Sequence, residues 1–180
     1  MRTLFLVPTQ GEATAFQSLC PDALVAIIGV GMAEAGASAA EAVAQYAPQR
    51  VVLAGVAGAL GEELQVGECV AVVKDSIVAL PKAYRVEYES SVWGDLKPAI
   101  AYTVNRTGES LPLADSGEGD SPAIEQMEGA AVAAVCRRVG VEFLHLRSIS
   151  NRVADARDKW RMPQAIEALT STLVKMYDKL

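Results

Sequence analysis

The sequence predicts an α/β protein, a single domain over residues 1–180 with a three-layer α/β/α arrangement around a central mixed, mostly parallel sheet. Short apolar runs alternate along the chain with Ala- and Glu-rich helical segments, which is the order expected of strands joined by covering helices. The length of 180 residues fits one domain. Hydrophobic residues make up 51% of the chain but aromatic residues only 6%, and small side chains let helices pack closely on a sheet.

The first half of the chain predicts the order strand, helix, strand, helix, strand, strand. Apolar runs predict strands at 3–7, 23–28, 50–53 and 68–73. Helices are expected at 12–19 and 33–46, because Pro21 and Pro48 stand where each pattern stops. A glycine-rich segment, 54–60, is expected as a loop after the third strand.

The second half is less regular at first. Strands are expected at 84–88 and 100–105, and the Gly-, Ser- and Asp-rich segment 107–121 predicts a surface loop. Pro122 then opens a predicted helix that runs to about Val139 and ends at Gly140. The chain closes with a buried strand at 141–149 and a helix at 162–179.

Composition excludes several classes of function. Lys and Arg number 16 against 22 Asp and Glu, a net charge of −6, which argues against nucleic acid as a partner. No run of about 18 apolar residues is present, so no membrane partner is expected. The cysteines (Cys20, Cys69 and Cys136) are far apart and His145 is the only histidine, so we expect no metal site, no cofactor and a reduced, cytoplasmic setting. A nucleophilic pair of His145 with a cysteine is a remote alternative.

Polar residues gather at two strand ends and one helix start, in the segments 7–12, 125–132 and 146–151. Ligands of open α/β sheets bind beyond the carboxyl ends of the strands. Glu12, Glu128 and Asn151 are therefore candidate site residues. Each alone also fits an ordinary role, as a first-turn carboxylate or a turn cap.

Segments 127–131 (MEGAA) and 147–151 (RSISN) resemble the nucleoside phosphorylase and nucleosidase superfamily, as do the glycine turns 29–32 and 55–60. The resemblance implies a nucleoside phosphorylase-like fold and a small-molecule purine nucleoside as substrate. It implies that Met127 and Glu128 bind the ribose, that Asn151 faces the purine, and that Ala57 and Gly58 of the second glycine turn contact the substrate. It also implies a homodimer or higher homo-oligomer.

Within that superfamily, the segments 127–132, 149–151 and 103–108, together with Arg157, Asp158 and Trp160, resemble the futalosine hydrolases. This resemblance implies hydrolysis of the N-ribosidic bond of futalosine, with release of hypoxanthine, in menaquinone biosynthesis. A cation is then expected near the benzoate-bearing 5′ group, and Arg152, Arg157 and Arg161 are the candidates.

Hydrolysis is favoured over phosphorolysis by the residues themselves. A phosphate dianion needs cations, hydroxyls or a cradle of amides, whereas segment 54–59 holds no Ser or Arg and the early loop has no Arg. Glu12 would repel phosphate but could deprotonate water. Asn151 cannot act as an acid but can donate to a 6-oxopurine such as hypoxanthine, and this argues against adenine nucleosides.

Other functions remain open at this stage. The chain could hydrolyse methylthioadenosine, adenosylhomocysteine or another purine nucleoside, or bind purine nucleosides without catalysis, because segment 75–120 looks shortened. A dinucleotide-binding module is disfavoured, since Glu34 stands where its third glycine belongs. Aromatic residues that could stack on the base or benzoate, or instead pack in the core or at a dimer contact, are Tyr84, Tyr88, Trp93 and Trp160.

Overall fold

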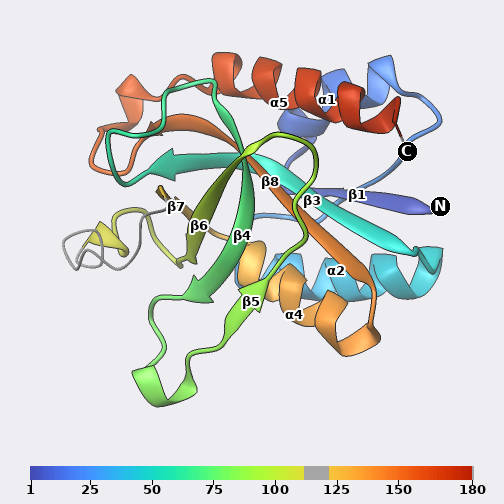
Figure 1. The fold of residues 1–180 in the computed structure, drawn as a ribbon, viewed down its shortest axis with the longest axis horizontal. Helices are drawn as coiled ribbons and strands as arrows, with labels where there is room; N and C mark the ends of the chain where they lie inside the picture. Colours follow the sequence, from blue (N-terminus) through green and yellow to red (C-terminus); the bar gives the residue numbers. More distant parts are fainter. Residues whose placement is uncertain (112–121, 180) are drawn as a thin grey trace.

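A computed structural model describes residues 1–111 and 122–179 of the chain (Figure 1). The strands are β1 (Thr3–Val7), β2 (Leu24–Ile27), β3 (Arg50–Ala59), β4 (Cys69–Ile77), β5 (Glu87–Glu89), β6 (Lys97–Thr103), β7 (Ala123–Gln126) and β8 (Glu142–Arg152). The α-helices of this described part are α1 (Gln10–Leu19), α2 (Met32–Tyr46), α4 (Gly129–Val139) and α5 (Met162–Tyr177). Helices and strands therefore alternate at both ends of the chain, as expected of an α/β protein.

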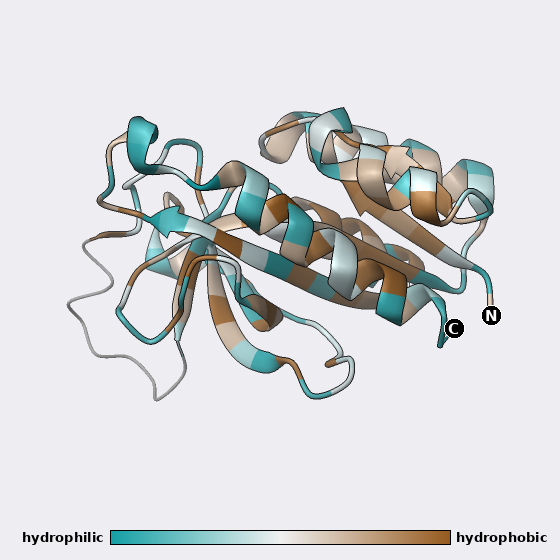
Figure 2. Cartoon of the chain, turned by 90° about the horizontal axis from the view of Figure 1, so that it is seen from above, coloured by the Kyte–Doolittle hydropathy of each residue, from teal (hydrophilic) through white to brown (hydrophobic). Residues whose placement is uncertain are grey.

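The strands form one mixed sheet of eight strands, of which one side is open and the other is rolled up. In the open part, β2, β1, β3 and β8 run parallel to one another. Helices α1 and α5 cover one face of this part and α2 and α4 cover the other (Figure 1). Seen from above, hydrophobic residues follow the strands beneath the helices (Figure 2).

The rolled part departs from the expected three layers. β8 pairs with β3 and also with β4, β4 pairs with β6, β6 with β7, and β7 returns to β3, so five strands form a ring. A small apolar core fills the ring: Ala57, Ala59, Leu64, Val70, Val72, Ala99, Ala101, Ile124 and Ile149. The fold is thus an α/β fold with a mixed sheet that is partly closed like a barrel.

Two sequence predictions about local structure were wrong. The glycine-rich segment 54–60 continues β3 to Ala59, because it pairs with β8 on one side and β7 on the other. Pro122 does not open a helix: residues 123–126 form β7 between β3 and β6, and α4 begins only at Gly129. Pairing with distant strands overrode the local preference in both places, for a loop at 54–60 and for a helix after Pro122. Of the predicted loop 107–121, residues 112–121 lie outside the described residues.

Helix ends agree better with the sequence. Thr9 caps α1 by accepting the N–H of Glu12, and Gly140 ends α4 in the left-handed conformation, with φ of 70°. Gly31 precedes α2 with φ of 90°, a conformation that favours glycine. Among the described residues, no helix is both long enough and apolar enough to cross a bilayer.

Candidate active site

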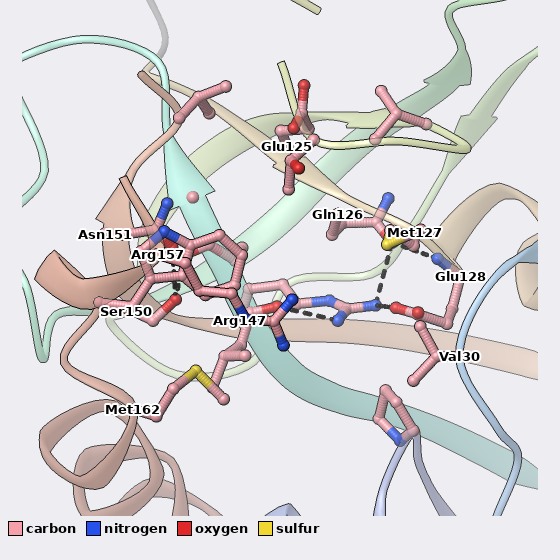
Figure 3. A pocket seen from close by; sticks show the side chains of 18 of the residues that line it. Val30, Glu125, Gln126, Met127, Glu128, Arg147, Ser150, Asn151, Arg157 and Met162 are labelled. Atoms are coloured by element: carbon pink, nitrogen blue, oxygen red, sulfur yellow. Dashed lines mark hydrogen bonds and ion pairs between the residues drawn. The ribbon is translucent and has the colours of Figure 1, made fainter. Parts of the chain in front are cut away.

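A cavity of about 740 Å³ opens at the carboxyl ends of β1, β3 and β8, where the chain was expected to bind a ligand. All the predicted site residues line it together: Glu12, Ala57, Gly58, Met127, Glu128 and Asn151. Figure 3 shows that β7, the two residues before α4, and β8 bring their side chains toward one space. The structure therefore unites residues that lie up to 139 positions apart in the sequence.

Glu12 lies in the first turn of α1 and is buried, with 4% of its surface exposed. Its Oε1 accepts the backbone N–H of Val56 at 3.0 Å, and its Oε2 accepts the hydroxyl of Thr9 at 2.5 Å. The helix N-terminus and both donors stabilise a negative charge there. A carboxylate has about four acceptor positions, so Glu12 keeps capacity for a further donor in the cavity.

Glu128 caps the start of α4 and is equally buried, at 3% exposure. Its Oε1 accepts the N–H of Gly31 at 3.1 Å, and its Oε2 forms an ion pair with Arg147 at 3.1 Å. The early glycine turn, which prompted the dinucleotide alternative, instead holds this carboxylate. Glu128 is thereby fixed from two sides, with acceptor positions left for ligand hydroxyls.

Arg147 is the main site residue that the sequence reasoning did not assign. It lies on β8, is 1% exposed, and lines the cavity with its guanidinium beside Glu128 (Figure 3). Besides Glu128, it donates to the carbonyl of Val56 at 3.1 Å, to Gln126 Oε1 at 3.0 Å and to His145 Nε2 at 2.9 Å. An arginine inside a run predicted to be a buried strand was the available signal, since a buried charge must be paired.

Asn151 lies near the end of β8 with 3% of its surface exposed. Its Nδ2 donates to the carbonyl of Arg152 at 2.7 Å, and its Oδ1 accepts the hydroxyl of Ser150 at 2.7 Å. Because the Arg152 carbonyl can only accept a hydrogen bond, the group of Asn151 that faces it must be the NH2 group. One amide hydrogen remains for a ligand. Gly58 makes room for this arrangement, because a Cβ there would lie 3.1 Å from Asn151 Nδ2.

Glu125 has a supporting role. It lies on β7, and its carboxylate accepts the N–H of Gly108 at 2.8 Å, the N–H of Ser110 at 3.0 Å and the Ser110 hydroxyl at 2.5 Å. These contacts hold the segment 106–111 beside the cavity. The segment supplies Arg106 and Thr107 to the lining, so the part of the chain that looked shortened still contributes a wall.

Of the arginines and aromatic residues considered for the 5′ group and the base, only some line the cavity. Arg157 and Trp160 line the cavity, and the Arg157 guanidinium lies 5.3 Å from the Trp160 ring centroid. Arg152 pairs with Glu62 outside the lining, and Arg161 also lies outside it. The remaining aromatic candidates do not line it either: Tyr84, Tyr88 and Trp93.

The sulfur and histidine chemistry considered from the sequence finds no support in the described residues. His145 is fully buried and accepts a hydrogen bond from Arg147. Burial raises the pKa of Cys136 to about 12, so this thiol is not a nucleophile near neutral pH. The described part of the chain holds no group of three His, Cys, Asp or Glu side chains placed for a metal ion.

Comparisons with known proteins agree with the fold. Residues 119–177 match a family described as Phosphorylase superfamily. No curated protein sequence matches the chain. Many solved structures do, and two from Helicobacter pylori have a TM-score of 0.87.

One of these two is a mutant of a methylthioadenosine nucleosidase with 5′-methylthioadenosine in its active site, 19% identical, with 99% of each chain covered. The other is a mutant of futalosine hydrolase, 18% identical, with 100% of each chain covered. A methylthioadenosine/adenosylhomocysteine nucleosidase from Neisseria meningitidis, in complex with methylthio-immucillin-A, has a TM-score of 0.87 at 15% identity over 100% of each chain. The chain therefore has a nucleoside phosphorylase-like α/β fold.

Proposed function

We propose that the protein is a purine nucleosidase that hydrolyses the N-ribosidic bond of futalosine and releases hypoxanthine without phosphate. The observation that carries this proposal is the convergence of two buried carboxylates and one amide, Glu12, Glu128 and Asn151, on a single cavity. The likeness of fold to purine nucleosidases supports an N-glycosyl hydrolase. The unpaired cysteines support a cytoplasmic location, and the resemblance supports a homo-oligomer.

The ribose would lie against Met127, with its hydroxyls donating to Glu128. Both oxygens of Glu128 are held by one donor each, so each retains an acceptor position for a hydroxyl. Cleavage of an N-ribosidic bond develops positive charge on the sugar, as glycoside cleavage does. A buried carboxylate beside that charge lowers its energy in the transition state.

Glu12 would activate the water. A carbon added at Gly55 would lie 3.2 Å from Glu12 Oε1 and 2.6 Å from Arg147 Nη1, so the two groups border one space beside the bare backbone of Gly55. A water beside this space could donate to Glu12 and accept from Arg147. Glu12 would take its proton as the oxygen attacks the anomeric carbon.

Asn151 would assist the leaving base. The base departs with the electron pair of the broken bond, and the free amide hydrogen of Asn151 would donate to N7 or O6 of the purine. Ser150 and the Arg152 carbonyl keep that hydrogen directed at the ligand. An amide suits a 6-oxopurine, whose anion is a weaker base than that of adenine.

The charges near Glu12 disfavour phosphorolysis. Arg147 brings a cation to the cavity that the sequence reasoning had not foreseen, but its guanidinium is already bonded to Glu128, Gln126, Val56 and His145. With Glu12 and Glu128 both carrying negative charge, a phosphate dianion beside them would be repelled.

The specific substrate is supported by two cavity cations away from this cluster. Arg106 and Arg157 both line the cavity, and a carboxylate on the substrate would be attracted to either. Methylthioadenosine has no such anion, whereas adenosylhomocysteine has a carboxylate, so the two arginines disfavour only the former. An adenine nucleosidase is the second candidate, because two of the similar structures are named as methylthioadenosine nucleosidases.

The test is an incubation of the protein with futalosine, methylthioadenosine and inosine, each with and without phosphate, while free base is measured. We expect phosphate-independent hypoxanthine release from futalosine. Strict dependence on phosphate would overturn hydrolysis, and faster adenine release would select the second candidate.

Two variants test whether Glu12 is the general base. Glu12→Gln should lower turnover about 10²- to 10⁴-fold with little change in binding. Glu34→Gln is the matched control, because Glu34 occupies the first turn of α2 and lies outside the cavity. Near-normal turnover of Glu12→Gln would remove this role.

A further inference from the structure

A buried polar cluster extends from Gln126 and Arg147, which line the cavity, to residues that do not line it and that the proposed mechanism does not use. Its members come from four strands: Asp75 of β4, Thr103 of β6, Gln126 of β7, and His145 and Arg147 of β8. All are buried, with exposures of 0–4%. Burying so many polar groups costs desolvation free energy, and apolar residues often fill such a space at no loss of stability. The cluster is therefore expected to have a functional role.

Asp75 connects to Arg147 through Gln126. The Gln126 amide donates through Nε2 to Asp75 Oδ2 at 3.0 Å and to Thr103 Oγ1 at 2.6 Å. Its Oε1 therefore faces the other way and accepts Arg147 Nη2 at 3.0 Å. The backbone N–H groups of Glu128 and Gly129 also donate to Oε1, so Asp75 acts together with them in setting the orientation of this amide.

Asp75 connects to Arg147 a second time, through His145. The Nε2 of His145 accepts the Nε–H of Arg147 at 2.9 Å, so the neutral ring carries its hydrogen on Nδ1. This buried Nδ1 has no hydrogen-bond partner among the described residues, and Asp75 Oδ2 lies 3.8 Å from it. Burial and the nearby Arg147 lower the pKa of His145 well below its usual value, so the ring stays neutral.

Gly129 makes room for Gln126 and His145 to lie side by side between Asp75 and Arg147. A Cβ at this position would collide with Asp75 Oδ2 and would lie 2.5 Å from His145 Cε1 and 2.8 Å from Gln126 Nε2. The start of α4 therefore packs its bare backbone over the cluster. The N–H of Gly129 also donates to Gln126 Oε1 at 2.6 Å, which adds to the same amide orientation.

We propose that Asp75 is a positioning residue: through Gln126 and His145 it presents two acceptors to Arg147 and so fixes the guanidinium that holds Glu128. The proposal rests on the proposed function insofar as Glu128 binds the ribose. It assigns Asp75 and His145 no contact with the substrate. Their effect reaches the reaction only through the position of Arg147.

Because Asp75 can ionise, the position of the Arg147 guanidinium depends on pH in this arrangement. The charged and polar groups that face Asp75 are Thr103, Gln126, His145, Arg147 and Glu128. Burial raises the pKa of Asp75 to about 7, against which the Thr103 hydrogen bond and Arg147 act. Ionised Asp75 attracts the Nδ1–H of His145, and protonation removes that attraction. Positioning is therefore strongest above pH 7 and weakens below it.

The first experiment needs no activity. His145 is the only histidine, so a long-range ¹H–¹⁵N spectrum of the full chain reports one imidazole. At pH 8 we expect a neutral ring protonated on Nδ1, and in Asp75→Asn, where only Arg147 still favours that form, a mixture of tautomers. Asp95→Asn, at an exposed position, is the control and should match the unmodified protein. The same Nδ1–H tautomer in Asp75→Asn would overturn the proposal.

The second experiment measures kcat and KM for hypoxanthine release from pH 5 to 9. Asp75→Asn should lower kcat about 10- to 100-fold and lose the change in rate near pH 7. His145→Gln, which keeps an acceptor for Arg147, should retain more activity than His145→Leu at equal folded fraction. If the unmodified protein releases no base, the proposed function fails while the spectrum still decides the positioning role.

Discussion

Gly55→Ala tests whether the space between Glu12 and Arg147 is where the chemistry occurs. Gly55 lies on β3 and pairs with Arg147 of β8 in the parallel register. A Cβ there would lie 2.6 Å from Arg147 Nη1, and 3.2 Å from both Glu12 Oε1 and Pro8 Cδ. Gly55 does not adopt a positive φ, so the substitution acts through space alone.

The size of the effect follows from the first of these distances. A carbon and a nitrogen without a hydrogen bond need about 3.4 Å or more, so the guanidinium must retreat by roughly 1 Å. The 3.1 Å contact with Glu128 then stretches or breaks, at a cost of about 1.5–3 kcal/mol for a hydrogen bond to a charged group. A misplacement of about 1 Å near a reacting centre lowers rates on the order of 10²-fold. We expect kcat/KM to fall about 10²- to 10³-fold.

The assay is hypoxanthine release from futalosine, together with thermal unfolding of each variant. Gly36→Ala is the matched control, because its Cβ would lie 3.6 Å from that of Ala131, an ordinary contact, inside helix α2. This control should keep full activity and gain about 0.5–1 kcal/mol of stability. Wild-type kcat/KM in folded Gly55→Ala would refute the reasoning.

Three further predictions concern the residues around this space. In Asn151→Asp, an oxygen replaces the Nδ2 that donates to the Arg152 carbonyl at 2.7 Å, so we expect the new carboxyl group to bind a proton. The variant should then gain hydrolysis of adenine nucleosides, measured as free adenine. No gain would weaken the argument that Asn151 selects a 6-oxopurine. Burial raises the pKa of Asp75 from 3.8 to about 7, so the folded state binds more protons than the unfolded state between those values. In denaturant titrations, the free energy of unfolding of the unmodified protein should therefore fall relative to that of Asp75→Asn, by on the order of 4 kcal/mol as the pH rises from about 4 to 7. A difference between the two proteins that does not change with pH contradicts this. Gly129→Ala should lower stability by about 3 kcal/mol or more in the same titrations, because its Cβ would collide with Asp75.

The sequence was informative where the site depends on strand ends. Glu12 and Asn151 follow apolar runs that local pattern identifies, and parallel strands bring their carboxyl ends to one edge. Their meeting at one edge was therefore predictable before any coordinates, whereas Glu128, which was placed inside a predicted helix, was assigned through the resemblance. The contacts that orient them were not, because donors such as the N–H groups of Val56 and Gly31 are invisible in side-chain patterns.

Gln126 and Arg147 show what limits such predictions. Gln126 was placed in a helix, and only its pairing with β6 makes it a strand residue that turns toward Asp75. Arg147 belongs to one of the motifs that carry the resemblance, but its partners come from β3, from β7 and from the residue that precedes α4. The ring of strands that assembles them depends on long-range pairing, which local periodicity does not encode.

The position of Arg147 also bears on why the proposed reaction uses water. A phosphate ion beside the sugar would need this guanidinium, the only cation that contacts Glu128 in the described part of the chain. An arginine normally binds phosphate through two N–H groups, and Arg147 has one left after its bonds to His145, Val56, Gln126 and Glu128. To supply the second from its ion pair, Arg147 would have to release Glu128, and the carboxylate that is proposed to hold the ribose would be left buried without its cation. Ribose binding and phosphate binding thus compete for one residue. Water makes no such demand, because it can accept one hydrogen bond from Arg147 while the ion pair stays intact.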